Sequence, residues 1–253
     1  PESLFEKKGG SFSVVSYHPN NRIELSIFES AFWNRYRNGV IQSPDWLYYS
    51  PVPMTGVSQF FSSRNSANIG LDVNFRITKK WLVYSQVGGM NLPNEKLGVN
   101  YQFGLRGFNF IVPNLSVQVE WNQVDPFSYS LNNKTANAVH MNQNIGHPLE
   151  NCSEKILRVQ YRYGRWLVNG KLNLVDQLVQ RPIIDGFENG KRQLSQWEIQ
   201  ASYWFNPKTN SQIFLQYADR IDKYEYSNSN FGYHSSWLSF GIRSNLHAIY
   251  QDF

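Results

Sequence analysis

The 253-residue sequence predicts an all-β protein, and more specifically an antiparallel transmembrane β-barrel of the outer-membrane type. Apolar and polar residues alternate with a period of two over long runs, and the connections between these runs alternate between short and long. No run approaches the roughly 20 apolar residues of a membrane-spanning helix. Aromatic residues make up 16% of the chain and charged residues only 17%, against roughly 25% charged residues in soluble domains.

The alternation is unbroken from Ile69 to Ile77, where every second residue is Ile, Leu, Val or Phe. A helix would place apolar residues three and four apart, so such segments predict strands with one apolar and one polar face. Eleven strands are expected, near residues 11–18, 22–32, 67–77, 81–88, 96–107, 115–125, 154–163, 166–176, 193–205, 211–219 and 236–253.

The connections between these strands support a membrane barrel rather than a soluble sandwich. Short turns, such as Pro19-Asn20-Asn21, alternate with long loops, as in outer-membrane barrels with short periplasmic turns and long external loops. Charges on the polar faces suit a water-filled or plugged interior better than a dry core. We therefore predict a single barrel domain over residues 1–253 in the outer membrane, with extracellular loops near 33–66, 126–153, 177–192 and 220–235.

The strand count carries a further expectation. Eleven is odd, whereas single-chain bacterial barrels normally have an even number of strands. An open sheet edge in lipid would leave backbone groups without hydrogen-bond partners. We therefore expect these residues to be the C-terminal part of a larger barrel, or to be completed by other segments.

Composition and motifs argue against several other functions. The net charge of +5 is scattered along the chain, so nucleic acid is not an expected partner. The single cysteine, Cys152, excludes an intrachain disulfide, and no two histidines have the spacing of metal ligands on one element, so no metal and no cofactor are expected. Ser235 and Ser236 follow His234, but no Gly-x-Ser-x-Gly motif is present. We therefore expect no catalytic residue and no enzymatic activity.

Candidate ligand residues lie in and around the loop at 126–153. Asp125, Tyr129 and His147 could bind a glycan, because aromatic rings stack on sugars and polar groups bond to their hydroxyls. The alternative is structural, with Pro126 and Pro148 fixing the points where the chain enters and leaves the loop.

A second candidate group is aromatic. Trp46, Tyr48 and Tyr49 lie in the middle of the first long loop. They are interpreted either as a partner-binding patch, since exposed aromatic residues dominate interface hot spots, or as part of the aromatic girdle at the membrane surface.

Specific segments resemble a known family. Ser16-Tyr17-His18 followed by residues 25–29 resembles an "LSY…GLFE" segment, residues 119–130 resemble "EYNRVRPYTYS", and residues 142–149 resemble "GQPLGHPLG". These segments are typical of Bacteroidetes outer-membrane barrels of the capsule-assembly (Wzi-like) family, some of which are linked to gliding motility. The order and spacing resemble the C-terminal half of that family over nearly the whole chain. Asp125 replaces the arginine that usually precedes Pro126 in the family, and if relatives contact an anionic sugar at that position, the reversed charge would oppose that contact here.

The resemblance implies a role in the assembly or attachment of surface polysaccharide. The implied partners are outer-membrane lipid or lipopolysaccharide together with surface polysaccharide. Two alternatives stay open. One is an accessory subunit of a gliding or secretion machine, with outer-membrane proteins as partners, and the other is a diffusion channel.

Overall fold

The computed structural model of the chain describes residues 8–34, 36–37, 40–41, 66–91, 98–126, 139–140, 143–144, 147, 149–183 and 186–244. Nearly all of these residues belong to antiparallel strands, which confirms the all-β class. Within them, no helix has the length and apolar character needed to cross a membrane.

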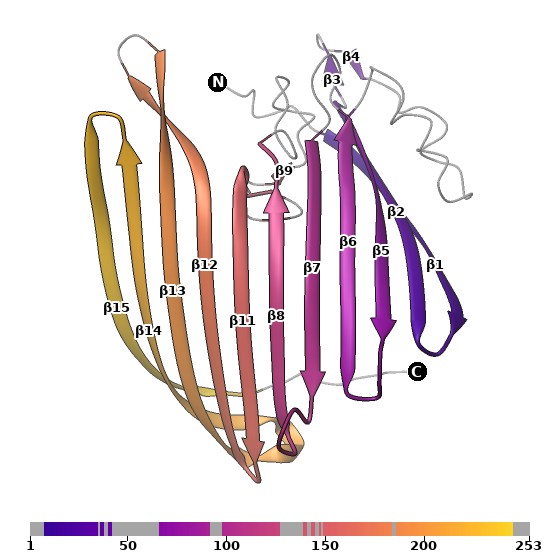
Figure 1. Ribbon diagram of the computed structural model, residues 1–253, viewed down its shortest axis with the longest axis vertical. Coiled ribbons are helices and arrows are strands. Elements are labelled where there is room, and N and C mark those ends of the chain that lie inside the picture. Colours follow the sequence, from indigo (N-terminus) through magenta and orange to yellow (C-terminus); the bar gives the residue numbers. More distant parts are fainter. Residues whose placement is uncertain are drawn as a thin grey trace. The chain divides into compact units, whose positions relative to one another are not determined.

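Eleven strands form the main sheet, as the sequence predicts. They are β1 (Lys8–Asn20), β2 (Ile23–Asn34), β5 (Ser66–Arg76), β6 (Trp81–Asn91), β7 (Gly98–Phe108), β8 (Leu115–Val124), β11 (Cys152–Tyr163), β12 (Trp166–Ile183), β13 (Gly186–Asn206), β14 (Ser211–Tyr226) and β15 (Ser229–Arg243). Each strand pairs with its neighbour in sequence, so the order is a simple meander with β1 and β15 at its two edges (Figure 1). Four two-residue strands form two separate small hairpins: β3 (Tyr36–Arg37) with β4 (Val40–Ile41), and β9 (Val139–His140) with β10 (Gln143–Asn144).

For two of the four long loops, the predicted extent is wrong, because the structure has strands where the loops were expected. Residues 177–192 and 220–235 largely continue the strands, because β12 pairs with β13 up to Ile183↔Gly186 and β14 pairs with β15 up to Tyr226↔Ser229. Apolar side chains in these extensions fall on both faces, such as Leu178 on one and Val179 on the other, so period-two hydrophobicity does not reveal them. Cross-strand polar pairs accompany the pairing there, including a hydrogen bond of 2.9 Å from Gln180 Nε2 to Asn189 Oδ1.

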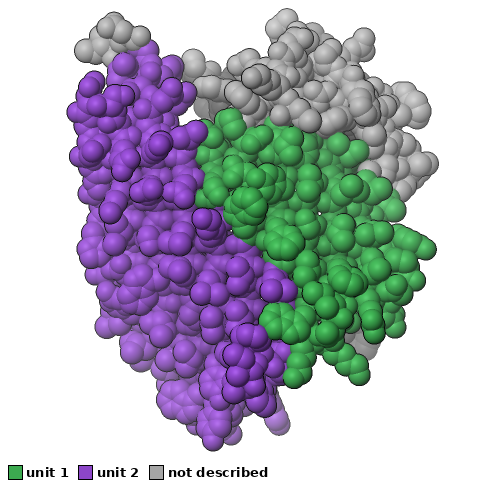
Figure 2. Space-filling model, in the orientation of Figure 1, with its two compact units in different colours: residues 1–104, 121–153 green, residues 105–120, 154–253 purple. Residues whose placement is uncertain are grey.

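The chain divides into two compact units (Figure 2). Unit 1 comprises residues 1–104 and 121–153, and unit 2 comprises residues 105–120 and 154–253. Most of the loops at 33–66 and 126–153, and the expected end of the last strand at 245–253, lie outside the described residues.

Unit 1 has one apolar and one polar sheet face. Large apolar side chains on one face are exposed, and Leu71 retains 56% of its accessible surface. Leu71 pairs with Ile27 across the strands, whereas its chain neighbour Asp72 points to the other face and pairs with Ser26, which is buried. The burial pattern is therefore the reverse of that of a soluble domain, where large apolar side chains are inside.

Unit 2 has the same reversed arrangement. Its apolar face carries exposed side chains from β13, β14 and β15, including Trp197, Ile199, Leu215, Leu238 and Phe240. The residues between them in sequence point to the other face, which is polar and carries Glu198, Gln200, Ser202, Gln212 and Gln216. Ser202 and Gln212 are buried, although Phe240 is 73% exposed.

Aromatic rings lie over glycines of neighbouring strands at several places. In unit 1 the Phe28 ring covers Gly70, its direct partner in the β2–β5 register, and the Tyr84 ring covers Gly104. In unit 2 the Tyr226 ring covers Gly190 and the Phe214 ring covers Gly241. The ring fills the space that the missing side chain leaves on the sheet and shields the backbone there, so each pair locks the local register.

Replacing Gly70 by alanine should therefore destabilise the protein. A Cβ at this position would fall on the Phe28 ring and within 2.5 Å of the Val87 carbonyl oxygen. We expect the free energy of unfolding, measured by urea titration in detergent, to fall by about 1–3 kcal/mol, as for other overpacked sites. Gly170→Ala in β12 is the matched control, because a Cβ there meets nothing within 4 Å. Equal stability of the two variants would contradict the ring-over-glycine interpretation.

Candidate functional site

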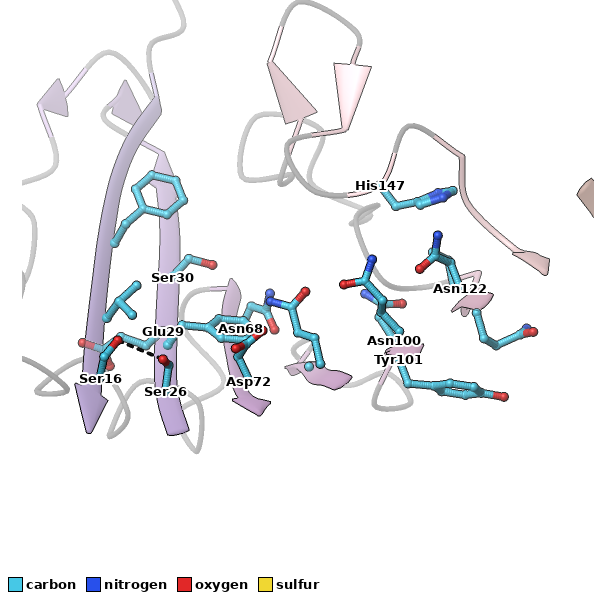
Figure 3. A pocket seen from close by; sticks show the side chains of 18 of the residues that line it. Ser16, Ser26, Glu29, Ser30, Asn68, Asp72, Asn100, Tyr101, Asn122 and His147 are labelled. Atoms are coloured by element: carbon cyan, nitrogen blue, oxygen red, sulfur yellow. Dashed lines mark hydrogen bonds between the residues drawn. The ribbon is translucent and has the colours of Figure 1, made fainter. Parts of the chain in front are cut away.

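The polar face of unit 1 contains a pocket of about 710 Å³. Strands β1, β2, β5, β6, β7 and β8 supply most of its walls, and His147 reaches it from the segment before β11 (Figure 3). Its polar lining includes Ser26, Asn68, Asp72, Gln86, Asn100 and Asn122. The pocket therefore offers hydroxyl, amide and carboxylate groups to a ligand.

The strand register builds one wall of this pocket. Ser16 pairs with Ser26, Ser26 with Asp72, and Asp72 with Gln86, so one row of polar side chains crosses four strands. Ser16 and Ser26 share a hydrogen bond of 2.8 Å between their hydroxyls (Figure 3). Asn74 Nδ2 donates to Asp72 Oδ1 at 2.8 Å. The row follows directly from period-two alternation, because residues of equal parity in paired strands share a face.

Aromatic side chains complete the lining. Phe12, Phe28 and Phe32 all contribute to it, and the rings of Phe12 and Phe32 meet edge to face with centroids 5.4 Å apart. Rings beside hydroxyl and amide groups suit a ligand that is apolar on its faces and polar at its rim. A sugar ring has this character.

Among the described residues, Asn68 in the pocket lining has a polar atom without a hydrogen-bond partner. Asn68 Oδ1 is buried, and no described residue donates a hydrogen bond to it. A buried acceptor without a partner costs roughly 1–3 kcal/mol. A ligand hydroxyl that donates to this oxygen would remove that cost.

The charge of the pocket is acidic. Glu24, Glu29 and Asp72 line it, and no lysine or arginine is among the described lining residues. Carboxylates accept hydrogen bonds from hydroxyl groups but repel anions. The lining therefore favours an uncharged polyhydroxyl ligand over an anionic one. Within the described part of the chain, no group of three His, Cys, Asp or Glu side chains is arranged to hold a metal ion.

Of the two predicted ligand residues that the structure describes, His147 and Asp125, only His147 is in the lining of the pocket. His147 lines the pocket, and its Nδ1 lies 3.2 Å from the Leu149 nitrogen and 3.9 Å from Cys152 Sγ. Asp125 instead joins two strand ends, because its Oδ2 accepts a hydrogen bond from the Val99 N–H at 3.2 Å and its N–H donates to Asn100 Oδ1 at 3.3 Å. These hydrogen bonds give Asp125 a structural role, and ligand binding by it stays a prediction.

The remaining predicted site residues, Tyr129, Trp46, Tyr48 and Tyr49, lie outside the described residues. Conversely, the pocket residues Asn68, Asn100 and Asn122 were not singled out in the sequence. Each occupies a polar position of an alternating strand, so the alternation assigns it to the polar face. Only the register between strands brings the three to one pocket.

No protein-family model and no curated protein matches this chain. The resemblance to capsule-assembly barrels therefore rests on its sequence motifs alone.

The environment of Cys152 gives a direct test of the His147 geometry. Cys152 is 2% exposed and is the only cysteine, so its thiol is a clean reporter. We expect slow labelling of the folded protein by an aromatic disulfide reagent and faster labelling of His147→Ala, because the imidazole covers the thiol. His18→Ala, far along the sequence on β1, is the control and should label as slowly as the unmodified protein. Rapid labelling of the unmodified protein would contradict this packing.

Proposed function

We propose that the chain forms part of the wall of an outer-membrane β-barrel and acts, without catalysis, in the assembly or attachment of surface polysaccharide. The observation that carries this proposal is the reversed polarity of the sheet. Large apolar side chains are exposed on one face, whereas Ser26, Asn122, Glu154 and Ser202 are buried on the other. Such a surface is stable when lipid covers the apolar face and water or ligand covers the polar face.

The extent of the apolar face supports a membrane rather than a soluble partner. Monomeric soluble proteins rarely expose contiguous apolar patches above a few hundred Å². Here exposed large apolar residues recur on every main strand from β1 to β15. Strands of 10 to 13 residues, such as β1, β2, β5, β6, β7, β8 and β11, match the roughly 9–11 tilted residues that cross the hydrocarbon layer.

Two aromatic pairs lie at different heights on the apolar face of unit 2. Trp166 and Tyr203 lie near the short turn with centroids 5.0 Å apart, and Trp197 and Tyr217 lie further along with centroids 5.2 Å apart. Tyr203 and Trp197 are six residues apart, or about 20 Å along a strand. Pairs at this separation fit the two aromatic girdles of a membrane barrel. Beyond Trp197, the same face carries polar residues such as Lys191 between apolar ones such as Leu178.

A charge on the apolar face should therefore impair membrane assembly. We expect Leu71→Arg to lose about 2–4 kcal/mol of folding free energy in phospholipid vesicles, because arginine is costly at a lipid-facing position. Asn74→Arg is the control, since Asn74 faces the polar side and pairs with Glu24. The folded fraction can be measured by heat-modifiable gel mobility. A chain that stays dissolved and monodisperse without detergent would overturn the membrane assignment.

The pocket supports the polysaccharide part of the proposal. It combines phenylalanine rings, amides, hydroxyls and the unsatisfied Asn68 Oδ1. These groups suit hydrogen bonding and stacking with an uncharged sugar, and the sequence motifs resemble those of capsule-assembly barrels.

The two sheet edges, β1 and β15, favour completion of the wall by further strands, because unpaired edges are costly in lipid.

Asn68→Ala should weaken binding of isolated surface polysaccharide. Loss of one hydrogen bond of about 1 kcal/mol corresponds to about fivefold weaker affinity, measurable by titration calorimetry in detergent. Cells with this variant should release more polysaccharide into the medium. Gln160→Ala in unit 2 is the control and should behave like the unmodified protein. Unchanged binding, together with a stoichiometric protein partner in mild detergent, would favour the accessory-subunit alternative.

A further inference from the structure

A second polar cluster lies in unit 2, where β12 to β15 continue beyond Trp197. Asp222 receives hydrogen bonds from two arginines. Arg192 Nε donates to Oδ1 at 2.8 Å, Arg192 Nη2 donates to Oδ2 at 2.7 Å, and Arg220 Nη2 donates to Oδ2 at 3.0 Å. Arg192 Nη1 also donates to Gln177 Oε1 at 3.1 Å. Beyond Trp197, the polar face of unit 2 thus carries a hydrogen-bonded group of Arg192, Asp222 and Arg220.

The charges in this group do not cancel. A single carboxylate neutralises one of two guanidinium groups, which leaves one positive charge. Arg192 is anchored by three donors and its side chain is only 15% exposed. Arg220 is 39% exposed and makes one hydrogen bond, to Asp222. Because a guanidinium has five N–H donors, Arg220 presents most of its donors, and the surplus charge, to the solvent.

Aromatic rings adjoin this arginine on the same face. In the β14–β15 register, Tyr233 is the partner of Asp222 and Ser235 is the partner of Arg220. Tyr233 is 66% exposed. Its ring contacts Phe231 at 5.9 Å, and Phe231 in turn stacks on Tyr224 at 5.0 Å. The exposed Tyr233 ring, which packs against Phe231, therefore lies next to the Arg220 guanidinium and the Ser235 hydroxyl. Most N–H donors of Arg220 face solvent.

We propose that Arg220, Tyr233 and Ser235 form a binding site for an acidic sugar residue of a polysaccharide, one that carries a carboxylate or a sulfate. A guanidinium binds such a group through two parallel N–H donors. The tyrosine ring stacks on the face of the sugar, and the serine hydroxyl bonds to a ring substituent. The Arg192–Asp222 pair holds Arg220 in place.

This site differs in charge from the unit 1 pocket, whose described lining is acidic and contains no lysine or arginine. The pocket suits uncharged sugars and the Arg220 site suits acidic ones, so the two sites differ in the sugars that they would bind. Lipid phosphate is a less suitable ligand, because Arg220 is on the polar face and not on the apolar face that lipid covers. The inference rests on the proposed function for the class of ligand.

The test uses the purified chain in detergent and two probes, oligogalacturonate as the acidic sugar chain and maltooligosaccharide as the neutral one. We expect oligogalacturonate to bind at Arg220 and to bind more weakly as salt is raised. Arg220→Gln should weaken it about tenfold, as for loss of a hydrogen bond to a charged group. Tyr233→Ala should also weaken binding, whereas Tyr233→Phe should retain it. Lys223→Gln is the control, since Lys223 is an exposed cation on the opposite face of β14.

The outcomes separate this inference from the proposed function. Equal binding of both probes, or unchanged oligogalacturonate binding by both Arg220→Gln and Tyr233→Ala, would overturn the acidic-sugar site. If Asn68→Ala leaves polysaccharide retention unchanged while Arg220→Gln still weakens oligogalacturonate binding, the pocket assignment fails and the acidic-sugar site stands. Arg220 is partly exposed and Tyr233 largely so, so neither variant should unfold the protein, and gel mobility of the heated and unheated samples checks this.

Discussion

Backbone hydrogen bonding between neighbouring antiparallel strands constrains every other feature of this protein. Each main strand pairs with the next in sequence, and a strand of fixed register must place successive side chains on opposite faces. A one-residue slip would move Leu71 to the polar face and Asp72 to the apolar face. The aromatic rings that cover Gly70, Gly104, Gly190 and Gly241 oppose such slips. Register, rather than a packed apolar core, therefore organises the molecule.

A polar face built in this way must satisfy its own hydrogen bonds. In unit 2, Asn173 Nδ2 donates to Glu154 Oε1 at 2.8 Å, and Arg106 Nη2 donates to Gln118 Oε1 at 2.8 Å. These networks hold polar side chains in fixed positions on the sheet. In unit 1 the network leaves Asn68 Oδ1 unsatisfied at a pocket. Where the network is incomplete, a ligand can complete it, and this links the architecture to binding.

The two candidate sites differ because the strands differ in length. The pocket of unit 1 lies on strands of 10 to 13 residues, within the span of the apolar face. The Arg220 site lies on β14 and β15, which have 16 and 15 residues, and is supported by Arg192 of the 21-residue β13. Arg192 and Asp222 point to the polar face there, so these charged groups are accommodated without lipid contact. Strand extension thus provides a second, chemically distinct surface.

The sequence by itself determined the all-β class, the number of main strands and the face to which each strand residue points, because these follow from a period of two that is local in the chain. Only the tertiary structure decided the length of the last four strands, since residues 177–192 and 220–235 do not keep their apolar residues on one face and so carry no sustained periodic signal. The sites also required it. Ser26, Asp72 and Gln86 are far apart in sequence, and pairing across strands, which no local pattern encodes, places them in one row.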